Sequence, residues 1–281
     1  MERVETGADV ETVAIYLGAH RSLTTISSAM MALHPEVVVL NHAFVRIFAD
    51  PTHDFLRSPT PETLEAFVRT AAEMSLGGEQ GKIGGHILHS HAFKADDALR
   101  QAYLDRYGWD AKPAAKCLLW KDATAVTNHI GGKRLDVAAA ARSLPALRFI
   151  AMVRNPVDIA ISSIRKGYSW ALVGEEKKND FDQVFVQMIR RFAWFSKHAA
   201  EQPGQFRFVF QDELLDRAHL IALCDFLRIS APQSWLDDVA RLIRLRESYA
   251  IADEKKAELK AIALRLIPDA RVAQRVAEQI V

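Results

Sequence analysis

The sequence predicts an α/β fold in which helices cover a central, mostly parallel sheet. Short continuous apolar runs recur along the chain, which is the pattern of strands buried on both faces. Segments with apolar residues at helical spacing separate these runs, as expected where helices connect parallel strands. The chain has 281 residues, of which 49% are hydrophobic, enough to bury a sizeable core.

The apolar runs predict the strands in order. The first run, Val13–Leu17, is followed by the loop GAHRS and then by a helix with Ile26, Met30 and Leu33 on one face. That helix ends at His34-Pro35, because a residue before proline disfavours the helical conformation. Further strands are predicted at Val37–Leu40, Cys117–Trp120, Leu147–Val153 and Phe206–Phe210, with a short strand or edge segment at Ile87–His91.

Several helices carry recognisable ends or faces. Thr60 is a predicted N-cap with Pro61 at the first helical position, and a helix over Ala95–Tyr107 is predicted to stop at Gly108. Apolar residues from Phe181 to Phe195 form a helical stripe, and nearly everything after Asp212 is predicted helical. With no repeat or composition shift, residues 1–281 are predicted to form one domain, with a core at 13–230 and a helical C-terminal extension at 231–281.

Charge and cysteine content exclude several classes of protein. The net charge is +1, which argues against a general nucleic-acid or membrane surface, although a local anion site remains compatible with it. The N-terminus is acidic and no long uncharged apolar run exists, so we expect neither a signal peptide nor a membrane span. Cys117 and Cys224 are expected to be reduced core thiols, and a cytoplasmic protein is the expectation.

The first chemical motif is the loop from Gly18 to Thr25. It leads from a strand into a helix, where free backbone N–H groups and the positive helix dipole favour an anion. Arg21 adds a charge, and Ser22, Thr24 and Thr25 add hydroxyl donors, a combination that suits phosphate or sulfate. An ordinary capped helix explains the loop equally well. The loop is not a Walker A motif, because G-x-x-x-x-G-K-[ST] is absent.

The second motif runs from Arg154 to Ser162. Asn155 can cap the following helix, Pro156 suits its first position, and Asp158 can close a capping box. Capping leaves Arg154 and Ser162 without a role, and these two side chains are placed to grip one anion.

Together the two motifs resemble those of the sulfotransferase family, in its bacterial and heparan-type branches. Family members carry a loop close to P-[KR]-S-G-T-[TS] and, later, R-x-P-x-D-x-x-x-S. The second pattern is complete here, from Arg154 through Ser162, whereas the first has His20 in place of proline and Leu23 in place of glycine. The resemblance also includes His34-Pro35, Trp120-Lys121-Asp122, the segment FRFVFQDELL from Phe206, and Phe226-Leu227, and it spans roughly residues 13–230.

The resemblance implies a P-loop NTPase-like three-layer sandwich and an activity. The enzyme would move a sulfuryl group from 3′-phosphoadenosine 5′-phosphosulfate (PAPS) to an acceptor hydroxyl or amine by in-line transfer, without a metal, leaving 3′-phosphoadenosine 5′-phosphate. Arg154 and Ser162 would bind the 3′-phosphate. They would contribute more of its binding here, because the C-terminal R-K-G segment with which some family members bind this phosphate is missing. Arg21 and Lys121 would stabilise the transferred charge. The 5′-phosphosulfate would bind to the loop residues His20, Arg21, Ser22, Leu23, Thr24 and Thr25.

A general base must take the acceptor proton, and histidine suits that role near neutral pH. His42 follows the strand VVVLN, where heparan-type relatives place a catalytic glutamate, and it is the first candidate. His91, in HSHAF, resembles the histidine of other members and is the second, ahead of His89 and His20. Each of them can instead be a hydrogen-bonded structural residue. His89 and His91 as metal ligands lack an evident third ligand.

Two other functions stay open at this point. One is a non-catalytic nucleotide-binding protein of sulfotransferase descent, which the departure at Leu23 permits. The other is a P-loop kinase, for which the required lysine and magnesium carboxylate are not found. The expected acceptor is a small molecule or a glycan, and a homo-oligomer is possible. The walls of the acceptor pocket are predicted at Asp50–Ser58, Gly77–Lys94 and Ser169–Asn179. The aromatic residues that could line this pocket include Trp109, Trp170 and Phe93.

Overall fold

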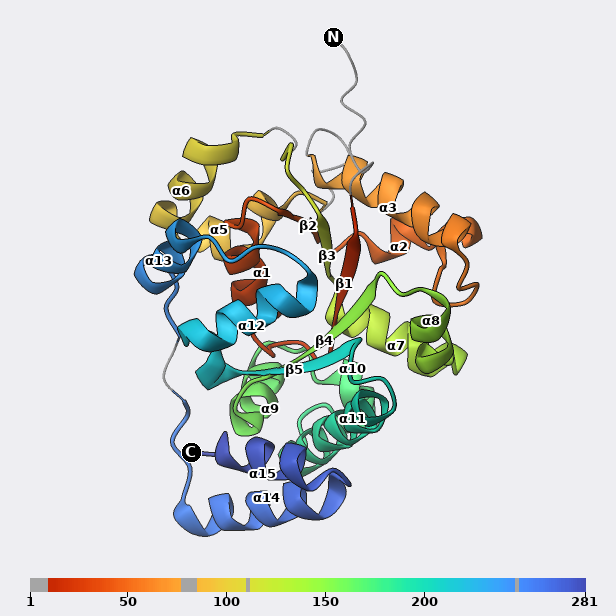
Figure 1. The fold of residues 1–281 in the computed structure, drawn as a ribbon. Helices are drawn as coiled ribbons and strands as arrows, with labels where there is room; N and C mark the ends of the chain where they lie inside the picture. Colours follow the sequence, from red (N-terminus) through yellow and green to blue (C-terminus); the bar gives the residue numbers. More distant parts are fainter. Residues whose placement is uncertain (1–9, 77–84, 110–111, 246–247) are drawn as a thin grey trace.

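A five-stranded parallel sheet organises the fold (Figure 1). The computed structural model describes residues 10–76, 85–109, 112–245 and 248–281. The strand order is β2-β3-β1-β4-β5, and every neighbouring pair is parallel. The predicted α/β class is therefore confirmed. The strands are β1 (Thr12–Leu17), β2 (Val37–Asn41), β3 (Cys117–Lys121), β4 (Leu147–Val153) and β5 (Phe206–Phe210).

Both faces of the sheet are buried, which explains why the strands are continuous apolar runs. Along β1, Val13, Ile15 and Leu17 pack into one core cluster, while Ala14 and Tyr16 pack into a second cluster on the opposite face. This alternation follows from the two-residue period of a strand. The sheet is thus the middle of three layers, in agreement with the P-loop-like arrangement that the resemblance implied.

The helices divide between the two faces (Figure 1). The first cluster is covered by α3 (Pro61–Ser75), α7 (Ala123–Lys133), α8 (Val137–Ser143) and α11 (Phe181–Glu201). The second is covered by α1 (Thr24–Ala32), α5 (His91–Ala95), α6 (Asp97–Tyr107), α12 (Arg217–Leu227) and α13 (Gln233–Leu242). The helices α14 (Asp253–Leu266) and α15 (Ala270–Glu278) pack on each other and extend the first cluster beyond α11. The remaining α-helices are α2 (Phe44–Ile47), α9 (Pro156–Arg165) and α10 (Trp170–Val173).

The predicted helix ends are largely confirmed. The Thr60 hydroxyl accepts a hydrogen bond from the backbone N–H of Thr63 at the start of α3. Gly108 follows α6 with a positive φ of 57°, a conformation that glycine adopts without strain. The long apolar stripe forms α11.

One local prediction was wrong, and one predicted helix begins two residues later than expected. Ile87–His89 forms a 3₁₀ turn, not a strand, because the His86 ring accepts a hydrogen bond from the N–H of Leu88 and closes the backbone on itself. The helix predicted over Ala95–Tyr107 is divided at Asp96, whose carboxylate caps α6 by accepting from the N–H of Leu99. The glycine-rich part of the predicted acceptor wall, residues 77–84, lies outside the described residues.

The connections between strands place the site. The chain leaves β1 toward the β2 edge of the sheet, whereas it leaves β4 toward β5. In open parallel sheets, ligands bind where the loops at the carboxyl ends of neighbouring strands diverge in this way. The loop that carries Arg21 and the motif that begins at Arg154 therefore face one another across the β1–β4 boundary.

Candidate active site

The loop after β1 is shaped by residues in the left-handed conformation. Arg21 and Leu23 have φ values of 70° and 64°, and Gly18 has a φ of 140°. The N–H of Gly18 donates to the hydroxyl of Thr127 at 2.9 Å, and the Ser22 hydroxyl donates to the carbonyl of Ala19 at 2.8 Å. The Ser22 hydroxyl therefore braces the loop. The loop leads into the first turn of α1, whose N–H groups have no partner within the helix.

The two sequence motifs meet through their side chains. Arg21 Nε donates to Ser162 Oγ at 2.8 Å, although 141 positions separate the two residues. Arg154 is instead paired with Asp158, at 3.1 Å. The expectation that Arg154 and Ser162 bind one anion must therefore include Arg21, because Arg21 is hydrogen-bonded to Ser162.

The motif after β4 is a capped helix start, as predicted, with one correction. The Asn155 side chain accepts a hydrogen bond from the N–H of Val157 and caps α9. Asp158 does not close a capping box. Its carboxylate is fully buried, and it accepts from Arg154 and from the N–H of Tyr249. Leaving a buried carboxylate without a cationic partner costs more free energy than leaving the helix without a second cap, so Asp158 pairs with Arg154.

Two donors in this motif have no acceptor. Among the described residues, Arg154 Nε and Asn155 Nδ2 are buried and make no hydrogen bond. Burial lowers the pKa of the Arg154 guanidinium, and the neighbouring Arg21 acts in the same direction. Buried donors without partners are costly, and an anion with several oxygens would satisfy both. These residues therefore fit a phosphate group.

The ends of β2 and β3 bring a second set of polar groups together. Lys121 is buried, and its Nζ donates to Asn41 Oδ1 at 3.0 Å and lies 3.1 Å from His42 Nε2. Burial lowers the pKa of Lys121 to about 8, although the nearby Asp122 carboxylate opposes that shift. The Nδ1 atom of His42 lies 3.5 Å from Asp122 Oδ1, and the His42 side chain is 53% exposed.

One cavity of about 530 Å³ joins the loop after β1 to the ends of β2 and β3. It brings together most of the residues singled out from the sequence, whereas Ser22, Leu23, Arg154 and Ser162 lie outside its lining. Burial lowers the pKa of His20, whose ring lies 4.9 Å from that of Tyr168 at the cavity wall. The lining residues are Ala19, His20, Arg21, Thr24, Thr25, His42, His91, Lys121, Asp122, Ala123, Thr124, Lys166 and Tyr168.

Several of these residues were not identified from the sequence. Asp122 and Thr124 stand at the start of α7, directly after a strand that ends in a lysine, and that position was the available signal. Lys166 and Tyr168 follow the helix of the second motif, and nothing in their spacing points to the cavity. Conversely, Phe93 is fully buried in the second core cluster and does not belong to the cavity wall.

Arg191 of α11 stabilises the loop after β1 through hydrogen bonds. Its guanidinium donates to the carbonyl of Gly18 at 3.5 Å, to Asn128 Oδ1 at 2.7 Å and to the carbonyl of Ala171 at 3.0 Å. Burial lowers the pKa of Arg191 to about 10. This side chain connects the loop after β1 to α7 and α10, which lie far from the loop in the sequence.

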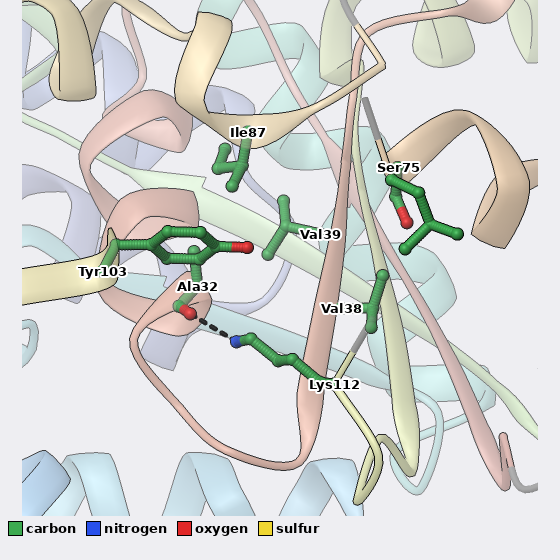
Figure 2. A pocket seen from close by; sticks show the side chains of 8 residues that line it. Ala32, Val38, Val39, Ser75, Ile87, Tyr103 and Lys112 are labelled. Carbon is green, nitrogen blue, oxygen red and sulfur yellow. Dashed lines mark hydrogen bonds between the residues drawn. The ribbon is translucent and has the colours of Figure 1, made fainter. Parts of the chain in front are cut away.

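A second hollow, beside Lys112, has a structural explanation (Figure 2). It measures about 20 Å³, room for a single water molecule. Lys112 Nζ donates to the carbonyls of Ala32, His34 and Val37, and so neutralises the negative C-terminal end of α1. Burial lowers the pKa of Lys112 well below its usual range. This lysine holds the turn between α1 and β2.

Neither a metal cluster nor a spanning helix is found in the parts of the chain that the structure describes. No group of three or more His, Cys, Asp or Glu side chains there is arranged to hold a metal ion. No described helix combines the length and apolar character needed to cross a bilayer.

Comparison with known proteins identifies the family. A model of the sulfotransferase family matches residues 14–233, and the chain belongs to that family. No curated protein matches the chain.

Three solved structures similar to this chain are of sulfotransferases. They include the sulfotransferase domain of the Synechococcus PCC 7002 olefin synthase, with a TM-score of 0.42, 16% identity, and coverage of 96% of this chain and 94% of that one. For the sulfotransferase from Alicyclobacillus acidocaldarius the TM-score is 0.45 and the identity is 16%, with 94% of this chain and 95% of that one covered. For the sulfotransferase domain from the curacin biosynthetic pathway the TM-score is 0.42 and the identity is 16%, with 96% of this chain and 97% of that one covered.

Proposed function

We propose that the protein is a PAPS-dependent sulfotransferase that moves a sulfuryl group to an acceptor hydroxyl or amine. The observation that carries the proposal is the pair of buried, unpartnered donors, Arg154 Nε and Asn155 Nδ2, beside the Arg21–Ser162 hydrogen bond. These groups suit the 3′-phosphate that distinguishes PAPS from ATP. The family assignment supports sulfuryl transfer in general.

The electrostatic character of the cavity supports an anionic cosubstrate. Arg21, Lys121 and Lys166 line it, and Asp122 is the one carboxylate among its lining residues. The first turns of α1 and α7 both reach the cavity and add the positive ends of two helix dipoles. In the proposed mode the 5′-phosphosulfate binds to the loop from His20 to Thr25, and the 3′-phosphate binds to Arg154 and Ser162.

In-line transfer then depends on positioning and on charge stabilisation. Arg21 and Lys121 stabilise the negative charge that moves onto the leaving phosphate. His42 removes the proton from the acceptor, which is supported by its place 3.1 Å from Lys121 and by its exposure to the cavity. His91, at the start of α5, also lines the cavity and is the second candidate for the base.

The acceptor is proposed to be a small molecule or a glycan that enters beside Tyr168 and Lys166. Tyr168 is 40% exposed, and the neighbouring Trp170 is 50% exposed, so the segment after α9 presents aromatic faces. Exposed aromatic faces of this kind offer apolar surface against which sugar rings and flat ligands can pack.

Calorimetric titration with 3′-phosphoadenosine 5′-phosphate tests the nucleotide site. Ser162→Ala should weaken binding by roughly one to two decades, since a charge-assisted contact contributes about 1.5–3 kcal/mol. Ser196→Ala is the control, because Ser196 is also a buried helical serine, its hydroxyl donates to the carbonyl of Ala193, and it lies outside the cavity lining. Equal affinity of both variants and the wild type would reject the 3′-phosphate assignment.

Arg154 needs a compensated variant. Removing it alone leaves the fully buried Asp158 carboxylate unpaired, which costs about 3–5 kcal/mol in buried pairs. The double substitution Arg154→Ala/Asp158→Asn removes both charges and keeps an acceptor for the N–H of Tyr249. We expect this variant to fold and to lose nucleotide affinity.

A transfer assay separates an enzyme from a binding protein. Labelled PAPS and a panel of hydroxyl and amine acceptors should give labelled product with the wild type. Tight binding of the nucleotide without transfer to any acceptor would favour the non-catalytic alternative. Binding of Mg-ATP in preference to the 3′-phosphorylated nucleotide would favour a kinase.

A further inference from the structure

The pairing of β2 with β3 places His42 next to Asp122. In this register Asn41 is paired with Lys121, so the residues that follow each of them leave the sheet side by side. As a result both ring nitrogens of His42 have a defined neighbour. Nδ1 lies 3.5 Å from Asp122 Oδ1, and Nε2 lies 3.1 Å from Lys121 Nζ.

The two neighbours favour the same tautomer of His42. An ammonium group has only hydrogens to offer, so the ring nitrogen that faces Lys121 must present its lone pair. An ionised carboxylate only accepts, so the ring nitrogen that faces Asp122 must carry the proton. Neutral His42 is therefore expected to hold its proton on Nδ1 and to keep Nε2 as the basic atom.

The backbone around His42 is held in an unusual conformation that aims the ring. His42 and Ala43 have φ values of 59° and 75°, the left-handed region that side chains other than glycine rarely adopt. The N–H of His42 donates to the carbonyl of Lys121 at 3.0 Å, and its carbonyl accepts from Trp120 Nε1 at 2.7 Å. Strained residues held by several partners are typical of functional sites.

Asp122 is itself anchored. Its Oδ2 accepts a hydrogen bond from the N–H of Phe44 at 3.2 Å, and only 15% of its side chain is exposed. The carboxylate therefore joins the start of α2 to the start of α7, with one oxygen turned to the backbone and the other to the His42 ring.

We propose that Asp122 is a positioning residue that holds His42 with its proton on Nδ1 and its basic Nε2 turned toward the acceptor. This inference rests on the proposed sulfuryl transfer. In the step, the acceptor O–H proton passes to Nε2 while the acceptor oxygen bonds to sulfur. The bond between sulfur and the 5′-phosphate oxygen breaks, and the phosphate keeps the electron pair.

The charges balance through the same contacts. The imidazolium that forms on His42 lies opposite the Asp122 carboxylate, which stabilises it. Lys121 keeps its hydrogen bond to Asn41 Oδ1 when the acceptor hydroxyl takes its place at Nε2. His20 also faces this group of charges, but its ring packs on Tyr168.

The variant Asp122→Asn tests the inference. Asparagine keeps an oxygen for the N–H of Phe44, but it removes the charge and offers a donor to Nδ1. We expect the population of the Nδ1–H tautomer of His42 to fall below that of the wild type, because only Lys121 then favours it and the asparagine amide opposes it. The tautomer population is read from the ¹⁵N resonances of His42, which are identified by their loss in His42→Ala. Turnover should fall roughly ten- to a hundred-fold, less than the 10⁴-fold known for the wrong tautomer in a fully buried triad. Affinity for 3′-phosphoadenosine 5′-phosphate should change less than twofold.

A matched control is Asp136→Asn. Asp136 also stands at a helix start, where it caps α8 by accepting from the N–H of Ala139, and it lies outside the cavity lining. This variant should keep full turnover. If Asp122→Asn leaves the tautomer population of His42 unchanged, or keeps wild-type turnover while His42→Ala loses it, the inference is overturned. A wild type that binds the nucleotide but sulfates no acceptor would refute the proposed function instead, and the ¹⁵N measurement would still decide the role of Asp122.

Discussion

Leu23 holds a backbone conformation that glycine adopts without strain. It stands before the first turn of α1 with φ 64° and ψ 5°, and the left-handed region costs a residue with a Cβ about 1–2 kcal/mol. Its side chain is partly buried against the second core cluster, which offsets part of that cost. The departure from the family's glycine is thus a change of side chain on a backbone that still suits glycine.

Leu23→Gly is therefore expected to leave nucleotide affinity equal or improved, with little net change in the free energy of unfolding. Relief of strain opposes the loss of packing and the greater freedom of glycine in the unfolded chain. Calorimetric titration and thermal unfolding measure the two effects. Leu23→Ala is the control, because it loses the packing and keeps the strain, and it should be the less stable of the two variants. A glycine variant that folds but no longer binds would contradict this account of the loop.

The charge of Lys121 gives a testable dependence on pH. Its pKa is lowered to about 8 by burial, against about 10.4 for a free lysine. Between these values the unfolded chain binds a proton that the folded protein has released, so the contribution of Lys121 to the free energy of unfolding rises as the pH rises through this window. The effect on the proposed reaction runs the other way, because the cation that would act at the leaving phosphate is lost above pH 8.

We expect kcat/KM to fall above about pH 8, with Lys121→Arg shifting that fall to higher pH because arginine stays charged. The measurement is a pH–rate profile of both proteins, restricted to conditions in which each remains folded. An unchanged alkaline limb in Lys121→Arg would assign the fall to another group.

Among the elements, α11 acts on the site without lining the main cavity. Arg191 of this helix donates hydrogen bonds to Gly18, Asn128 and Ala171, and thereby joins the loop after β1 to α7 and α10. Arg191→Lys should weaken binding of 3′-phosphoadenosine 5′-phosphate roughly tenfold, since a single ammonium cannot reproduce the guanidinium's geometry. Arg190→Lys, one position earlier and exposed on the same helix, should bind normally. Equal titration curves for the two variants would show that the loop holds its shape unaided.

The strands were predictable from the sequence because each is a short, mostly apolar run between turn residues, interrupted only by Arg148 in β4 and Arg207 in β5. The loop after β1 and the capped start of α9 were also predictable, since their chemistry is local to a few consecutive residues. The Arg21–Ser162 hydrogen bond and the place of Asp122 beside His42 were not. They depend on the order and register of strands that lie far apart in the chain, and local spacing carries no information about which strand pairs with which.

At the scale of the whole molecule, the two cysteines report on the integrity of the core. Both are fully buried free thiols, and burial raises the pKa of Cys117 and of Cys224 to about 12. Only the thiolate reacts, so neither should label in the folded protein at pH 8. We expect both to label together when denaturant unfolds the chain, as followed with a chromogenic disulfide. Cys224→Ala leaves Cys117 as a single probe of β3, and fast labelling of that variant under native conditions would show that the sheet opens locally.

Strand β1 is synthesised first, yet it lies in the middle of the sheet, between β3 and β4. Its backbone partners begin at Cys117 and Leu147, so the ribosome must deliver the entire chain between Leu17 and Cys117 before the first of those pairings can form. Until then an apolar segment that ends up fully buried has no sheet to enter, which is the kind of surface that molecular chaperones bind. Closing such distant contacts is slow because loop entropy is lost before the pairing is gained. Production of this protein is therefore expected to depend on how long a cell can shield the nascent β1 segment.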